Sequence, residues 1–148
     1  MRLMIAAAIV AGGLFASIHG ASAQQVGGWR KGWGQGVTEL SVKNGSGNEL
    51  LISCNDFSPE GSILIQIHGD GPRPGTFEKI ILDAEEFTGP FNTECRSCNA
   101  NFVAVLQKLP RAKSMLVQFS DGRSSSFSLK GAAKAIQSSS CAPRGKSR

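Results

Sequence analysis

The segment VTELSVKNGSGNELLISC, residues 37–54, predicts an antiparallel β-hairpin. Two β-prone runs flank a turn rich in Gly and Asn, which is the composition that hairpin turns favour. Working outward from this hairpin, we expect further strands over residues 62–68, 76–83, 114–120 and 124–129, and a short one around Phe87. Turns rather than helical crossovers join these strands, so we predict a mainly β, antiparallel sandwich or partial barrel.

The apolar spacing changes from strand-like to helix-like in NANFVAVLQKL, residues 99–109. Its apolar residues recur at helical spacing, so the pattern predicts a helix. Asn99 is expected to cap the start of this helix, and Pro110 is expected to end it. A second, short helix is predicted over residues 131–139. We expect these one or two helices to pack on the sheet.

Residues 1–23 have the parts of a secretory signal peptide. Arg2 supplies a positive charge, an apolar run follows, and Ala21-Ser22-Ala23 forms an A-x-A cleavage site. We therefore expect cleavage near Ala23 and a bacterial protein that is periplasmic or secreted. No later stretch is apolar enough to span a bilayer, so we expect no transmembrane segment in the mature chain.

The rest of the chain divides into three parts by composition. We predict an irregular, Gly/Trp-rich entry segment over 24–36, a single disulfide-stabilised β-rich domain over 37–142, and a basic tail over 143–148. Without Arg2 the chain holds 15 Lys or Arg residues against 11 Asp or Glu residues. This modest excess forms no basic stripe with interleaved aromatic residues, so we do not expect a nucleic-acid partner.

All four cysteines follow the signal peptide, and an even number in an exported chain predicts two disulfides. We favour pairing Cys95 with Cys98 and Cys54 with Cys141. The alternative joins Cys54 to one member of the Cys95/Cys98 pair. A helix start and Arg96 would both stabilise a thiolate in this pair, so redox chemistry stays open. A zinc site would need more cysteine or histidine ligands nearby, and we expect neither a metal nor another cofactor.

Two segments are candidates for binding a partner. Exposed tryptophans beside basic residues can stack on a sugar or contact a protein. We favour their burial as a plug over the sandwich and keep the binding role as the alternative. The loop HGDGPRPG, residues 68–75, presents polar groups on a rigid backbone. The candidate binding residues are Trp29, Arg30, Lys31 and Trp33 in the first segment, and His68, Asp70 and Arg73 in the second.

The C-terminal half of the chain carries a family resemblance between residues 95 and 136. A cysteine pair precedes an apolar helix, a strand of the type MLVQF follows, and FSLKGAAKAI comes after a turn. The matching residues are Cys95, Cys98, Leu106, Leu109, Val117, Phe119, Phe127, Leu129, Gly131, Ala135 and Ile136. This pattern resembles the invasion-associated locus B family of small exported bacterial proteins. The resemblance implies a β-rich fold, and some of those proteins are linked to host-cell entry. The family supplies no catalytic residues.

The sequence favours an exported binding module over an enzyme. It has no G-x-S-x-G motif, and His68 is the only histidine after the signal peptide. We expect the partner to be a protein or a cell-envelope polymer; the sequence sets no oligomeric state. One alternative is an inhibitor or immunity protein that blocks a cell-wall hydrolase with the 68–75 loop. Another is a small thiol–disulfide oxidoreductase that uses Cys95 and Cys98.

Overall fold

The computed structural model describes residues 24–26 and 28–143 and arranges them in two antiparallel sheets with two short helices. This confirms the predicted mainly β, sandwich-like architecture. The predicted signal peptide and its cleavage site lie outside the described residues, as does the basic tail after Pro143. No helix of the described part is long and apolar enough to cross a membrane.

The first sheet has five strands in chain order, from β1 to β5. They are β1 (Gln24–Val26), β2 (Trp29–Gly34), β3 (Val37–Lys43), β4 (Glu49–Asn55) and β5 (Gly61–Gln66). The predicted hairpin is β3–β4, in which Val37 pairs with Asn55 and Lys43 with Glu49. Alternate side chains of both strands are buried, so the strand period of two places one face of the sheet on the core.

The irregular conformation predicted for residues 24–36 is wrong, because most of this segment is strand. β2 pairs with β3 along its whole length, from Trp29 opposite Val42 to Gly34 opposite Val37. Ladder hydrogen bonds use only the backbone, so a Gly-rich stretch can extend a sheet whose edge is already formed. Burial of the Trp29 side chain, which is 0% exposed, stabilises this pairing.

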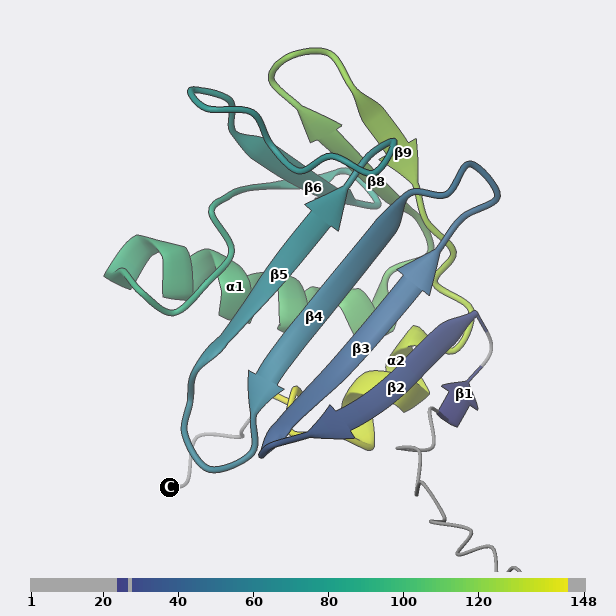
Figure 1. The fold of residues 1–148 in the computed structure, drawn as a ribbon, viewed down its shortest axis with the longest axis vertical. Coiled ribbons are helices and arrows are strands. Elements are labelled where there is room, and N and C mark those ends of the chain that lie inside the picture. The colour runs from purple at the N-terminus through teal and green to yellow at the C-terminus, as the bar shows by residue number, and fades with distance from the viewer. Residues whose placement is uncertain (1–23, 27, 144–148) are drawn as a thin grey trace, which may run out of the picture.

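The second sheet has four strands in the order β7-β6-β8-β9. They are β6 (Glu78–Leu82), β7 (Glu85–Thr88), β8 (Met115–Phe119) and β9 (Ser124–Ser126). Each was predicted from the sequence, and β6, β8 and β9 are shorter than their predicted runs. Figure 1 shows this sheet at one end of the first sheet, with the helices behind the first sheet.

The helices are α1 (Arg96–Lys108) and α2 (Ala132–Gln137), with a single 3-10 turn, η1 (Leu109–Arg111), after α1. α1 begins before the predicted start, and Cys95 rather than Asn99 is its cap. The Cys95 Sγ accepts a hydrogen bond from the Cys98 amide at 3.0 Å, which satisfies a free amide of the first turn. α1 contacts β5 and β7, and α2 contacts β1 and β2, so the helices cover the inner face of the first sheet.

Candidate functional site

The structure contains two disulfides, and they are the favoured pair. Cys54 joins Cys141 with an S–S distance of 2.08 Å, and Cys95 joins Cys98 at 2.09 Å. The crossed alternative is therefore excluded. Disulfides persist in oxidising compartments, so the pair indicates a protein that folds outside the cytoplasm.

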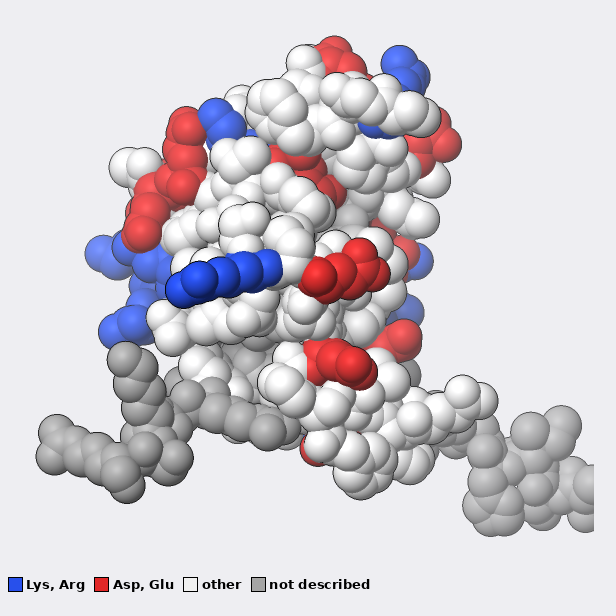
Figure 2. Space-filling model, turned by 90° about the vertical axis from the view of Figure 1, so that its left-hand side faces the viewer, with Lys and Arg blue, Asp and Glu red and all other residues white. Residues whose placement is uncertain are grey.

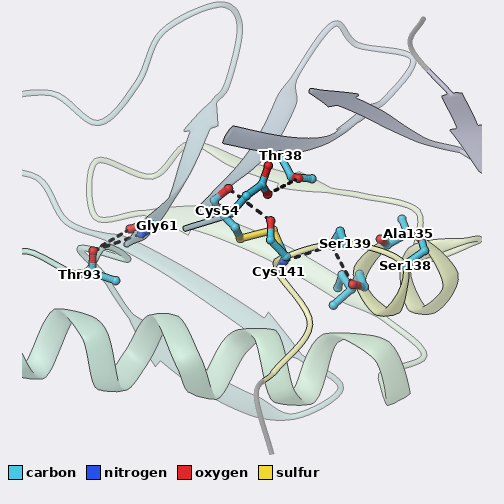
Figure 3. Close-up of a disulfide and its surroundings, with 11 residues drawn as sticks. Thr38, Cys54, Gly61, Thr93, Ala135, Ser138, Ser139 and Cys141 are labelled. Atoms are coloured by element: carbon cyan, nitrogen blue, oxygen red, sulfur yellow. Dashed lines mark hydrogen bonds between the residues drawn. A yellow bond between two sulfur atoms is a disulfide. The ribbon is translucent and has the colours of Figure 1, made fainter. Parts of the chain in front are cut away.

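The Cys54–Cys141 disulfide ties the end of β4 to the segment that follows α2. Figure 3 shows the bond beside Thr38 of β3, with α1 passing nearby. The neighbouring Ser140 hydroxyl donates to the Cys54 carbonyl oxygen at 3.4 Å. This cross-link therefore brings residues from the C-terminal segment to one end of the first sheet.

The two tryptophans of β2 have opposite environments. The indole Nε1–H of buried Trp29 donates to the Ser128 carbonyl at 3.0 Å, so this side chain belongs to the core and is not free to contact a partner. Trp33 is 60% exposed. Four residues along a strand return to the same face, so Trp33 lies on the inner face but beyond the end of the core.

Trp33 is one part of an exposed aromatic cluster that we call the aromatic tip, formed by Trp33, Gly36, Asp56 and Phe57. The Trp33 Nε1–H donates to Asp56 Oδ2 at 2.5 Å, and the Asp56 amide donates to the Gly36 carbonyl at 2.9 Å. Phe57 is 86% exposed, and a Cβ at Gly36 would lie 2.5 Å from its ring. Gly36 also has φ +78°, so both space and backbone require glycine here. Two exposed rings, one beside the β2–β3 turn and one in the β4–β5 turn, are thus held at the same end of the first sheet.

Asp56 fixes the aromatic tip through several donors. The Ser140 hydroxyl has the largest effect, and with the hydroxyl of Thr38 and the Trp33 indole it holds the pKa of Asp56 below its usual value. The Thr38 Oγ1–H donates to Asp56 Oδ1 at 2.8 Å. Nearby Lys31 is half-buried and its ammonium donates to the Ser138 carbonyl, so this candidate binding residue has a structural contact. Its neighbour in β2, the candidate Arg30, is exposed.

The second candidate segment is held by a residue that sequence analysis missed. His68, Asp70 and Arg73 are all exposed. The Arg123 guanidinium, from outside this loop, donates to the Gly71 carbonyl at 3.0 Å and to the Asp70 carbonyl at 3.4 Å. The predicted rigidity of the loop therefore has a cause outside it. Arg123 lies in a D-G-R turn, and nothing in that local pattern indicates a contact more than 50 residues away.

Arg123 is itself oriented by an ion pair. Its Nη2 lies 2.8 Å from Asp121 Oδ2, and both side chains are mostly buried. The guanidinium donating to Asp121 lowers the pKa of that carboxyl, and Asp121 in turn raises the pKa of Arg123. The guanidinium also lies 4.7 Å from the centre of the Phe119 ring, a distance at which a cation is attracted to the ring face.

The aromatic tip and the 68–75 loop lie at opposite ends of the first sheet. Trp33 pairs with Thr38, which pairs with Cys54, whereas Glu49 at the other end of β4 pairs with Gln66, next to the 67–75 loop. Five residues of strand separate these ends, about 17 Å at roughly 3.3 Å per residue. The aromatic tip and the loop are therefore separate sites.

Sequence analysis also missed a carboxyl group, that of Glu78, which lies at a core position of β6. Glu78 is only 8% exposed and shares the inward face of the strand with Ile80 and Leu82. It borders a cavity of about 280 Å³, which we call the Glu78 hollow. Its lining residues are Ser62, Ile63, Leu64, Ile65, Gln66, Gly71, Pro72, Glu78, Pro90, Phe91 and Asn92.

The surroundings of Glu78 contain no compensating cation. No ion pair found among residues 24–26 and 28–143 includes it. Burial raises the pKa of Glu78, and a hydrogen bond from the Phe91 amide offsets only part of that effect. A charge on the apolar face of a strand breaks the alternating pattern, and this signal was visible in the sequence at positions 78, 80 and 82.

The remaining candidate chemistry is that of the Cys95–Cys98 disulfide at the start of α1. Cys95 is exposed and Cys98 is buried at 8% exposure.

Within the described residues, no three or more His, Cys, Asp or Glu side chains cluster as metal ligands would. Figure 2 shows acidic and basic side chains scattered over one side of the molecule, with much uncharged surface between them.

Fold and cross-links together define a disulfide-bonded, mainly β protein of two antiparallel sheets. Over residues 27–136 the chain matches the model of the YfjT family, and it belongs to that family. The searches of curated proteins and of solved structures found no match. The resemblance to the invasion-associated locus B family stays a prediction, since no comparison tests it.

Proposed function

We propose that the chain is an exported, non-enzymatic binding module that contacts a cell-envelope polymer through the aromatic tip. Signal-peptide cleavage near Ala23 would release it into the periplasm or the medium. The observation that carries the proposal is the pair of exposed rings, Trp33 at 60% and Phe57 at 86% exposure. Large aromatic side chains are normally buried, so two of them fixed together in solvent favour a contact surface.

The rings are held before any partner arrives. Asp56 restrains the Trp33 indole, and Gly36 supports the Phe57 ring, as described above. Side chains that are already ordered lose less conformational entropy on binding. The flat faces of such rings stack on the C–H groups of a sugar, and the neighbouring polar groups can hydrogen-bond to its hydroxyls.

The small size of the aromatic tip favours a polymer over a protein. A stable protein interface buries about 800 Å² per partner around an apolar centre. Two rings do not supply such a centre. Two further large apolar side chains that are exposed among the described residues lie apart from the tip: Leu64 is on β5 and Phe77 precedes β6.

The test is co-sedimentation of the purified protein with insoluble envelope polysaccharide, comparing the wild type with Trp33→Ala/Phe57→Ala. Both rings are exposed, so the double variant should fold while binding at least tenfold more weakly. Phe77→Ala is the matched control, because Phe77 is 53% exposed and lies just before β6 of the other sheet, and it should bind like the wild type. Equal binding by the double variant and the wild type would contradict the proposal.

The inhibitor hypothesis is favoured by one observation: the Arg123 guanidinium donates hydrogen bonds to two backbone carbonyls of the 68–75 loop and holds it in place. A rigid protruding loop is a suitable plug for an enzyme cleft, because little entropy is lost when it binds. Under this alternative the exported protein co-purifies with a cell-wall hydrolase, and His68→Ala/Arg73→Ala weakens the inhibition. Loss of inhibition in Trp33→Ala/Phe57→Ala instead would point back to the aromatic tip.

The oxidoreductase hypothesis depends on the exposed Cys95 at the start of α1. A thiol that attacks disulfides must be reachable from solvent. Cys95 is exposed, so its sulfur would be reachable once the disulfide is reduced. Insulin reduction that is lost in Cys95→Ser would support this alternative. Complete resistance of the pair to mild reductant would make Cys95–Cys98 a structural cross-link.

A further inference from the structure

The Glu78 hollow combines two features, of which the first is a buried carboxyl group that accepts a hydrogen bond from the Phe91 amide but has no cation beside it among the described residues. Glu78 is more than nine-tenths buried, lies beside a cavity and has no cation partner among the described residues. A buried carboxylate is costly unless an opposite charge or several donors compensate it. A cationic group entering the hollow would supply that compensation.

The second feature is a gap in the hydrogen bonds along the outer edge of β5. The Ile63 amide donates outward to the Phe91 carbonyl at 2.8 Å, and the Ile67 amide donates to the Asp70 carbonyl at 2.9 Å. Alternate residues of a strand direct their backbone groups to the same side, so the amide and carbonyl of Ile65 also point outward. No hydrogen bond from the described residues reaches either group.

These two features border the same cavity. Ile65 and Glu78 both line the Glu78 hollow, which is about 280 Å³ in volume. The backbone of an extended chain can exchange two hydrogen bonds with one edge residue. The bridges of Ser62 with Asn92 and of Ile67 with Asp70 close both ends of the gap, so only a short segment fits between them.

We propose that the Glu78 hollow binds a short extended peptide segment that carries a primary ammonium group, such as a lysine side chain. The peptide backbone pairs with Ile65 as an added strand, and the ammonium group pairs with Glu78. This site is separate from the aromatic tip and does not depend on the function proposed for it. A single carboxylate provides too few oxygen ligands for a divalent cation, which needs about six.

The test is an amide NMR titration of the ¹⁵N-labelled exported protein with N-acetylated, C-amidated Val-Lys-Val. The expected result is a saturable shift of the Ile65 amide, whose exchange with solvent also slows. Val-norleucine-Val, which keeps the backbone and lacks the ammonium group, should bind at least tenfold more weakly. Cadaverine, a diamine without a peptide backbone, should leave the Ile65 amide unprotected.

Protein variants give a second arm. Glu78→Gln keeps the shape of the side chain and should weaken the lysine peptide about tenfold, whereas Glu86→Gln on exposed β7 should not. If Glu78→Gln fails to fold, the norleucine comparison still decides the outcome. Absence of an Ile65 shift at millimolar peptide would overturn the proposal. So would equal binding of the norleucine peptide, or protection of the Ile65 amide by cadaverine.

Discussion

Asp56 and Glu78 are two carboxyl groups at strand ends, and the protein treats them in opposite ways. Asp56 is half-buried, and the side chains of Ser140, Thr38 and Trp33 lower its pKa. Glu78 is buried between the sheets, where desolvation raises its pKa. The difference teaches that the number of hydrogen-bond donors around a carboxyl group, rather than its residue type, decides whether folding lowers or raises its pKa.

The donors around Asp56 come from distant parts of the chain. Thr38 belongs to β3, and Ser140 is brought in by the adjacent Cys54–Cys141 disulfide. Glu78 instead packs against the nearby segment that follows β7, where its Cγ would lie 2.5 Å from a Cβ at Gly89. The aromatic tip thus depends on a long-range cross-link, whereas the Glu78 hollow depends on local close packing.

The largest expected effect comes from removing that cross-link. The Cys54–Cys141 disulfide spans 87 positions, and the loop-entropy relation assigns it about 4.6 kcal/mol of stability. The Cys95–Cys98 disulfide spans 3 positions and is assigned about 1.6 kcal/mol. Replacing each pair by serines and measuring guanidinium unfolding should reproduce this order. Only loss of the longer cross-link should raise the pKa of Asp56 in an NMR titration.

A smaller effect is expected where Glu78 packs on Gly89. In Gly89→Ala the new methyl group must displace the Glu78 side chain, which should lower the free energy of unfolding by about 1–3 kcal/mol. Gly45→Ala is the control, since a Cβ there meets nothing within 4 Å. Combining Gly89→Ala with Glu78→Ala should recover much of the loss. If the Gly89→Ala protein is as stable as the Gly45→Ala control, the Glu78 side chain is not confined by its packing on Gly89.

The smallest effect should be the pH dependence, and its sign should differ between the two groups. The lowered pKa of Asp56 means that it stabilises the fold above the usual aspartate pKa of about 3.9, and that this stability is lost as pH falls through the folded-state pKa. The raised pKa of Glu78 gives stability below the usual glutamate pKa of about 4.3, which is lost as pH rises through its folded-state value.

These signs predict opposite behaviour of two isosteric variants. Relative to the wild type, Asp56→Asn should lose stability most at neutral pH, and Glu78→Gln should gain stability as pH rises from acid to neutral. Urea midpoints measured for the three proteins at each pH from 3 to 8 test this, and the wild-type reference cancels the acid sensitivity of Asp83 and Asp121. If the stability of both variants relative to the wild type changes with pH in the same direction, the opposite roles assigned to Asp56 and Glu78 are wrong.

Local sequence patterns predicted most of the strands and both helices. The favoured one of the possible cysteine pairings is the one that the structure contains. The β3–β4 hairpin follows from two alternating runs around a Gly/Asn turn, since hairpin contacts are close in sequence. The strand at 29–34 was missed because its glycines carry no alternation, and it is held by its pairing with β1 and β3. The Asn99 cap was wrong because Cys95, which the disulfide already holds in place, satisfies the first turn of α1.

The sequence by itself determined an antiparallel β-rich protein with four cysteines that can pair, because periodicity and turn composition act over short distances. Only the tertiary structure decided that Trp29 is core and Trp33 is surface, although both lie on one face of β2. It also decided that Arg123 fixes a distant loop and that Glu78 borders a cavity. The physical reason is that burial and long-range hydrogen bonds depend on where the two sheets and the helices meet, and no local pattern encodes that boundary.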